Sequence, residues 1–115
     1  MKQFEVEGNT IIIKGNRVSF QHKIDNVKNC NGLHIVLLDI PSDTQFLNNV
    51  YAVDDSGRIV WQIQDAGEVY PIKNDIDYVG TRITEDNEVV VTNFYGVTYT
   101  VDPTNGRILD RGTTK

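Results

Sequence analysis

Turn-forming residues recur at short intervals along the whole chain. Glycine, asparagine and aspartate in such clusters tolerate a positive φ or cap a turn. No window between them shows a sustained helical stripe of apolar residues, so the close spacing of the turns favours short strands joined by hairpins. The turn clusters are Gly8-Asn9, Gly15-Asn16, Asn31-Gly32, Asp54–Gly57, Asn93–Gly96 and Pro103–Gly106.

The runs between these turns have the period of strands. Apolar residues alternate with polar ones over 17–24, and 50–53 and 97–101 are rich in β-branched and aromatic residues. The run 33–40 is apolar at nearly every position, as in a central strand covered on both faces. A short buried helix is the alternative there, which the closing Pro41 disfavours. The expected strands are 3–7, 10–14, 17–24, 33–40, 49–54, 58–64, 76–84, 88–93, 97–102 and 107–111.

These features predict one all-β domain over residues 1–115. We expect an antiparallel meander of hairpins, folded as a small sheet stack or an open barrel, with little or no helix. The segment 41–48 is the one place where a single helical turn is expected. A chain of this length buries enough surface to need no disulfide or metal for stability.

Two hairpins echo each other. Tyr51-Ala52-Val53-Asp54, a turn and Gly57-Arg58-Ile59-Val60 match Tyr99-Thr100-Val101-Asp102, a turn and Gly106-Arg107-Ile108-Leu109. In both, the aspartate can accept hydrogen bonds from turn amides, and the glycine takes a left-handed conformation without steric cost.

The first of these hairpins resembles the outer hairpin of a quinoprotein-type β-propeller blade, and the second resembles a weaker copy. The resemblance implies that Trp61 packs between blades, whereas the matching position of the second copy is Asp110. Propellers typically have at least four blades. Two such units cannot close a ring, so we expect a propeller-blade-like stack and not a whole propeller.

The net charge of −5 comes from 16 acidic and 11 basic residues. Seven of the acids and two of the bases lie between Asp65 and Glu88, so this segment alone accounts for the imbalance. Nucleic acid is a poor partner for such a chain, since phosphate binding relies on clustered Lys and Arg. The first residues lack a signal-peptide pattern, and no apolar run is long enough for a membrane helix. With Cys30 as the only cysteine, a cytoplasmic location is expected.

No constellation of residues points to catalysis, a metal or a cofactor. Cys30 lies in a predicted turn, where an incidental thiol is the simpler interpretation than a nucleophile assisted by a histidine. His22 shares a strand face with apolar residues, and His34 opens an apolar strand, so both suit a core position better than a zinc site. Asp54–Gly57 lacks the ligand pattern of a calcium loop. The chain is therefore predicted not to be an enzyme.

Two features remain as candidates for binding a partner. The acidic segment is either a set of solvated loops and strand edges or a negative face for a basic protein. The tip Phe94-Tyr95 either exposes an aromatic anchor or packs one ring back over the sheet edge. The partner-binding candidates are Asp75, Asp77, Glu85, Asp86, Glu88, Phe94 and Tyr95.

In size and acidity the chain resembles small bacterial immunity proteins, which neutralise toxins. That resemblance implies a non-enzymatic protein-binding function with a basic toxin as partner. Two alternatives stay open. One is a small-ligand module in which Trp61, Tyr78 and Tyr99 line a pocket between sheets. The other is an assembly subunit that pairs through an open sheet edge.

Overall fold

The described part of the chain folds into eleven strands that form three antiparallel sheets. The structure is a computed structural model that describes residues 4–72 and 74–113. Each sheet is a meander of consecutive strands, in the orders β1-β2-β3, β4-β5-β6-β7 and β8-β9-β10-β11. The strands are β1 (Phe4–Glu7), β2 (Thr10–Ile13), β3 (Asn16–Ser19), β4 (Ile24–Cys30), β5 (Leu33–Leu38), β6 (Val50–Val53), β7 (Ile59–Gln62), β8 (Tyr78–Ile83), β9 (Val89–Asn93), β10 (Val97–Val101) and β11 (Ile108–Thr113).

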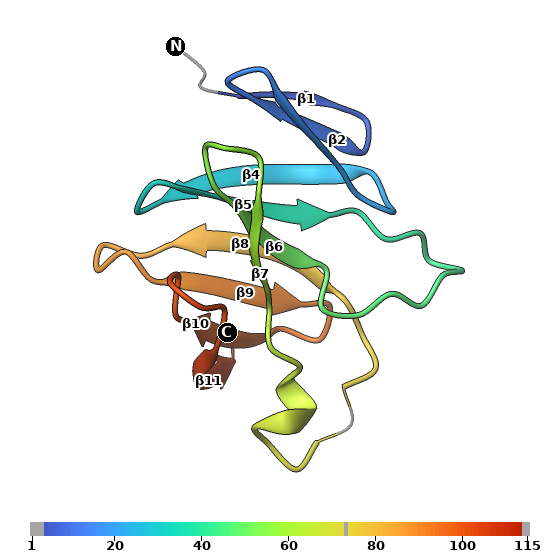
Figure 1. The fold of residues 1–115 in the computed structure, drawn as a ribbon. Helices are drawn as coiled ribbons and strands as arrows, with labels where there is room; N and C mark the ends of the chain where they lie inside the picture. The colour runs from blue at the N-terminus through green and yellow to red at the C-terminus, as the bar shows by residue number, and fades with distance from the viewer. Residues whose placement is uncertain (1–3, 73, 114–115) are drawn as a thin grey trace.

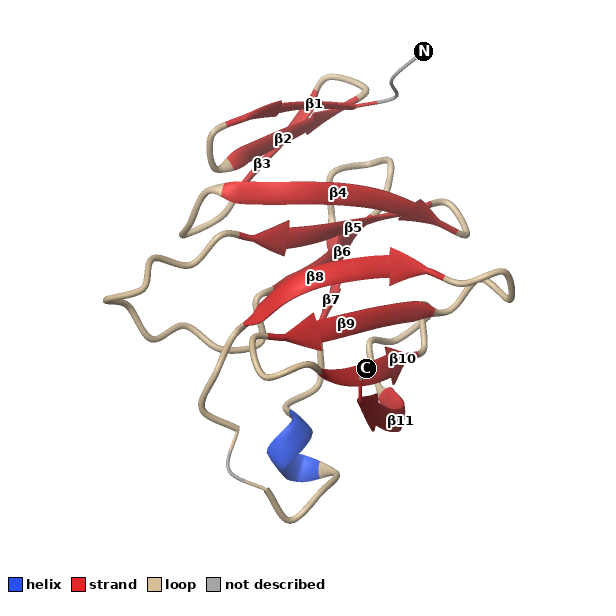
Figure 2. Ribbon diagram, turned by 180° about the vertical axis from the view of Figure 1, so that it is seen from behind, coloured by secondary structure: helices blue, strands red, loops and turns tan. Residues whose placement is uncertain are grey.

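The three sheets are stacked in chain order, from the first at the top of Figure 1 to the third at the bottom. The all-β prediction is confirmed, and the arrangement is a stack of open sheets, not a barrel. Helix within the described residues is confined to η1, a single turn over Ala66–Glu68 (Figure 2). No helix there is long or apolar enough to span a membrane.

The central strands of the middle sheet, β5 and β6, are buried on both faces. Along β5, Val36 and Leu38 pack against the first sheet, and Ile35 and Leu37 pack against the third. Successive side chains of a strand point to opposite faces, so a strand between two cores must be apolar throughout. This confirms the prediction of a central strand in 33–40.

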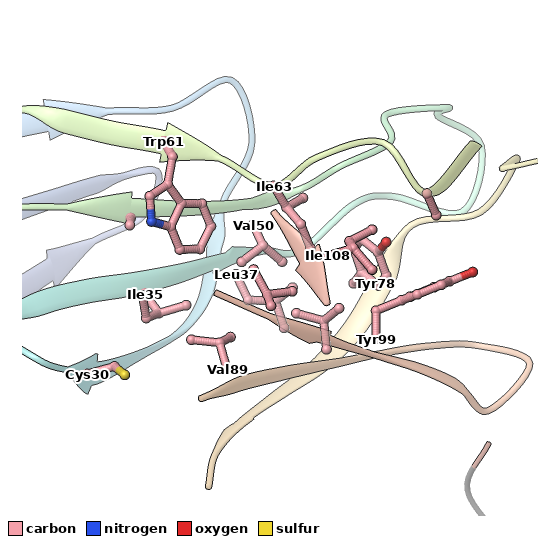
Figure 3. Packing of buried hydrophobic residues seen from close by; sticks show 14 residues of the cluster. Cys30, Ile35, Leu37, Val50, Trp61, Ile63, Tyr78, Val89, Tyr99 and Ile108 are labelled. Atoms are coloured by element: carbon pink, nitrogen blue, oxygen red, sulfur yellow. The ribbon is translucent and has the colours of Figure 1, made fainter. Parts of the chain in front are cut away.

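The larger of the two cores lies between the second and third sheets. Figure 3 shows its side chains. Trp61 lies inside it, and its indole N–H donates to the carbonyl of Pro103 at 2.8 Å. Gly106 has a φ of +77°, and a Cβ added to it would lie 2.6 Å from the Trp61 ring. The tryptophan thus docks the middle sheet onto the backbone of the β10–β11 turn, as the blade resemblance implied.

The two echoing hairpins have the same irregularity. The register shifts between Ala52 and Val53 in one and between Thr100 and Val101 in the other. Just before each shift, Ala52 pairs with Trp61, and Thr100 pairs with Asp110. Asp110 is exposed on the far face of the third sheet, the face that points away from the middle sheet. On the equivalent face of the middle sheet, Trp61 packs against the next sheet.

The turn chemistry of these hairpins is also as predicted. Asp54 Oδ1 accepts the N–H groups of Ser56 and Arg58, both at 3.0 Å, and Asp102 Oδ1 accepts that of Thr104 at 2.9 Å. The hydrogen bond from the Ser56 hydroxyl is the largest cause that lowers the pKa of Asp54. Both aspartates therefore fix the turns that position the following strands.

The prediction of one strand over 17–24 is wrong. The chain bends after Ser19, and β4 begins at Ile24. The apolar alternation continues through the bend because Val18, Phe20 and Ile24 all enter the core between the first two sheets. Strand β4 was missed because its sequence, IDNVKNC, is poor in residues that favour strands.

Other local predictions need correction too. Cys30 is the last residue of β4 and not part of a turn, and His22 lies in the bend. The segment 41–48 contains one turn, closed by a hydrogen bond from the Thr44 N–H to the Pro41 carbonyl, and otherwise no regular secondary structure, so the expected helical turn there is wrong. The first sheet is a third blade-like meander that the two-hairpin interpretation did not include. The expected start of the first strand at residue 3 lies outside the described residues.

Candidate binding surface

Two chain segments meet at the start of β8 because a buried asparagine holds them together. Asn49 is fully buried, and its amide nitrogen donates to the carbonyls of Leu38 and Tyr78, both at 2.9 Å. Its Oδ1 accepts the N–H of Tyr78 at 2.8 Å. These three bonds fix the loop between β5 and β6 against the chain that enters the third sheet.

Asn48 adds a second set of links. It has a φ of 57°, a conformation that asparagine tolerates better than most residues. Its side chain donates to Asp65 Oδ2 at 3.1 Å and accepts from Asn74 at 3.3 Å. The hydrogen bond from Asn48 is the largest cause that lowers the pKa of Asp65.

A cleft of about 440 Å³ lies between the segments that these asparagines hold. Residues 42–47 line one side, and residues 75–77 line the other. Three carboxylates border it, those of Asp43, Asp75 and Asp77. Within residues 4–72 and 74–113, no three potential metal ligands are grouped so that they could hold one ion. The cleft is therefore an acidic depression with apolar side chains such as Ile76 in its wall.

The predicted aromatic tip lies at the same end of the third sheet. Phe94 and Tyr95 form the β9–β10 turn, which follows Asn93, the partner of Tyr78 in the ladder. Asn93 Oδ1 accepts the N–H groups of Tyr95 and Val97 at 3.0 and 3.1 Å and so shapes the turn. Phe94 is 75% exposed and Tyr95 is 71% exposed. Of the two alternatives considered for the tip, the structure therefore has an exposed tip, with neither ring packed back over the sheet edge.

A smaller hollow of about 160 Å³ is lined by Tyr95 of the tip and shares two lining residues with the cleft. Tyr95, Tyr99 and Arg111 contribute to its lining, and Asp75 and Ile76 line both this hollow and the cleft. We call the region formed by residues 42–47, 75–77 and 94–95 the loop-end surface. It brings together Asp75, Asp77, Phe94 and Tyr95 from the predicted set.

The remaining acidic candidates lie elsewhere. Glu85 and Asp86 form the β8–β9 turn, and Glu88 follows it, at the opposite end of β8 (Figure 2). The rise per residue of a strand makes this separation roughly 20 Å. The acidic segment is thus two surfaces and not one. Asp43 also belongs to the loop-end surface but was not among the predicted residues, because it lies 32 positions before Asp75 and outside the acidic run.

The residues considered for catalysis are engaged in other contacts. Cys30 is buried, its Sγ donates to the carbonyl of Asn87 at 3.2 Å, and burial raises its pKa. His34 is also buried, and its Nε2 lies 2.9 Å from Asp55 Oδ1. The His22 ring stacks edge-on against Phe46 with centroids 4.8 Å apart. These contacts attach turns and loops to neighbouring elements.

The three aromatics proposed to line a ligand pocket all belong to the core between the second and third sheets. Tyr99 borders the smaller hollow, whereas Trp61 and Tyr78 belong to the lining of neither the cleft nor that hollow. Burial in this core raises the pKa of Tyr78.

Fold and surface together define a partial β-propeller-like stack with an acidic, aromatic end. The chain belongs to a family described as Domain of unknown function (DUF7957), whose model matches residues 1–113. No curated protein matches the sequence.

Two solved structures share the arrangement of strands. The computationally designed Ika8 protein is 13% identical with a TM-score of 0.64, and the match covers 97% of this chain and 34% of that one. BamB from Moraxella catarrhalis, a β-propeller protein, is 10% identical with a TM-score of 0.53, and the match covers 98% of this chain and 35% of that one. The chain thus spans about a third of the length of each. At these identities the likeness concerns the fold alone.

Proposed function

We propose that this domain is a non-enzymatic binding module whose loop-end surface takes a basic protein partner. The observation that carries the proposal is the exposure of both Phe94 and Tyr95 next to an acidic cleft. Exposed aromatic side chains supply large contact area at interfaces, and complementary charge raises the rate of association and helps reject wrong partners.

An immunity protein against a basic toxin is the specific form of this proposal. The net charge of −5 and the three carboxylates around the cleft support it. A location in the cytoplasm belongs to the same proposal, and the single, buried thiol of Cys30 is compatible with a reducing compartment.

The two acidic groups provide a matched test. Asp75→Lys/Asp77→Lys reverses two charges at the loop-end surface, and Glu85→Lys/Asp86→Lys reverses two at the far end of β8. Each variant and the wild type are immobilised and used to capture proteins from the source cell at low and high salt. We expect a basic protein to bind the wild type and the far-end variant, and to be lost from the loop-end variant and from Phe94→Ala/Tyr95→Ala.

Two results would overturn the proposal. One is equal capture by all four proteins, which would show that neither the carboxylates nor the aromatics contribute. The other is loss from the far-end variant only, which would place the interface at the β8–β9 turn. Thermal unfolding of each variant verifies that the substituted proteins are folded.

A further inference from the structure

Among the described residues, β1 is an edge strand of the first sheet. Strands β3 and β7 are the last strands of the first and second sheets before the chain passes to the next sheet, so they occupy equivalent positions. By the same match, β2 corresponds to β6 and β1 to β5. In the second and third sheets, β4 and β8 lie beside β5 and β9. No described strand occupies the matching place beside β1. Strand β1 is therefore an edge where its counterparts are internal.

The burial of β1 reflects this edge position. All but one residue of β5 is buried, and all but one of β9, whereas three of the four residues of β1 are exposed. Val6 pairs with Ile11, which pairs with Val18 on β3, and both of those side chains are in the core. Val6 shares their face and is nevertheless 42% exposed. A strand beside β1 would cover it.

The hairpin register also leaves backbone groups available at this edge. Glu7 and Thr10 close a two-residue turn, which makes them a hydrogen-bonded pair of the ladder. Bonded and non-bonded pairs alternate along antiparallel strands, so Glu5 with Ile12 is the next bonded pair. The N–H and C=O groups of Phe4 and Val6 then point away from β2, toward the open edge.

The side chains on the other face of β1 indicate which strand fits. Glu5 and Glu7 are exposed there. The guanidinium of Arg17, a residue of β3, lies 3.4 Å from Glu7 Oε1. Basic side chains at alternate positions of an added strand would meet these carboxylates, and apolar ones between them would cover Val6. Pairing of β1 with β1 of a second copy would instead place glutamates against glutamates, which is unfavourable.

We propose that the open edge of β1 binds an extended segment of a partner protein with basic side chains at alternate positions and apolar ones between them. Such strand addition takes its affinity from main-chain hydrogen bonds and its specificity from alternate side chains. The site uses elements separate from the loop-end surface and does not depend on the function proposed for that surface.

Hydrogen exchange of the full chain tests this with two short blocked peptides, one alternating Lys with Val and the other Glu with Val. With the Lys peptide at about ten times its Kd, exchange of the Phe4 and Val6 amides is expected to slow about tenfold, because the free fraction falls by 1 + [L]/Kd. The Glu peptide should leave these amides unchanged. A concentration-dependent dimer with the same protection and no peptide would mean that a second copy is the occupant, against the proposal.

Two variants separate main-chain pairing from charge. Val6→Pro removes an outward N–H, a substitution that edge strands tolerate, and should abolish the protection at Phe4. Glu5→Lys/Glu7→Lys should lose the Lys peptide and gain the Glu peptide, an exchange of preference that a misfolded protein cannot produce. Absence of protection in the wild type, equal binding of both peptides, or unchanged binding by Val6→Pro would overturn the proposal.

Discussion

The Asn49 side chain bonds both backbone groups of Tyr78: its Nδ2 donates to the Tyr78 carbonyl at 2.9 Å, and its Oδ1 accepts the Tyr78 N–H at 2.8 Å. Both residues are buried, so neither group of Tyr78 has access to water. A third bond ties the same asparagine to Leu38. The entry of the chain into the third sheet thus depends on a side chain that precedes β6.

Asn49→Ala is expected to destabilise the protein by about 3 kcal/mol, since it leaves buried backbone groups without partners. Denaturant unfolding followed by Trp61 fluorescence measures the loss. Asn105→Ala is the control, because Asn105 makes an exposed bond to the Arg107 N–H, and should cost less than about 1 kcal/mol. Equal losses for the two variants would contradict the prediction.

Gly106→Ala should be more harmful than the same change at Gly15. Both glycines have a positive φ, +77° and +83°, but only at Gly106 would the new Cβ meet the Trp61 ring. Gly15→Ala reports the backbone strain alone, about 1 kcal/mol. We expect Gly106→Ala to exceed it by about 2 kcal/mol and to change the emission of the single tryptophan. Similar unfolding midpoints for the two variants would exclude a close contact at Trp61.

Asp55 should contribute to the pH dependence of stability. The contact with His34 is the largest cause that lowers the pKa of Asp55 below its ordinary value of 3.8, and Lys14 adds to it. A lowered folded-state pKa gives stability that is present above the unfolded pKa and is lost as the pH falls through the folded one. Asp55→Asn should therefore be less stable than the wild type at neutral pH, with a difference that shrinks below about pH 4.

The measurement for Asp55 is thermal unfolding across this range of pH. Asp39→Asn, at another exposed aspartate, serves as the control. A difference between Asp55→Asn and the wild type that stays constant down to about pH 2 would assign the effect to lost packing and not to charge.

Cys30 should resist alkylation in the native protein. Its thiol is buried, and the raised pKa keeps it protonated near neutral pH. Mass spectrometry after treatment with iodoacetamide should show slow labelling that becomes fast in denaturant. Rapid labelling of the folded protein would instead indicate that the contact between β4 and the Asn87 turn opens readily.

Much of the fold was predictable because hairpins are specified locally. The Asp–Gly turns after Val53 and Val101 and the continuous apolar run of β5 identified strands and their burial correctly. Strand β4 was not predictable in this way, because contacts distant in sequence hold it in the strand conformation. It pairs with β5, and Asn26 accepts a hydrogen bond of 3.0 Å from Thr81 of the third sheet.

The candidate surface was predictable only in part. Strand alternation predicts that at least one ring of the Phe94-Tyr95 tip is exposed, since adjacent residues cannot both face one core, whereas the exposure of both rings comes from their place in the turn. The division of the acidic run follows from the course of β8, which places its flanking acids at opposite ends. Asp43 belongs to the surface because the hydrogen bonds of Asn48 and Asn49 hold its loop beside the start of β8. The only local signal for that loop was an asparagine, which accommodates a positive φ.

The exposed Asp110 has a consequence for how larger assemblies can form. The far face of the third sheet, which points away from the middle sheet, carries Asp110, three threonines (Thr92, Thr98 and Thr100) and the aliphatic Val90, where the equivalent face of the middle sheet offers a tryptophan. A fourth sheet laid on that face would have to strip water from a carboxylate and would gain no aromatic anchor. Extension of this architecture is therefore favoured at the edge of β1, by adding strands to the first sheet, over stacking a fourth sheet on the third.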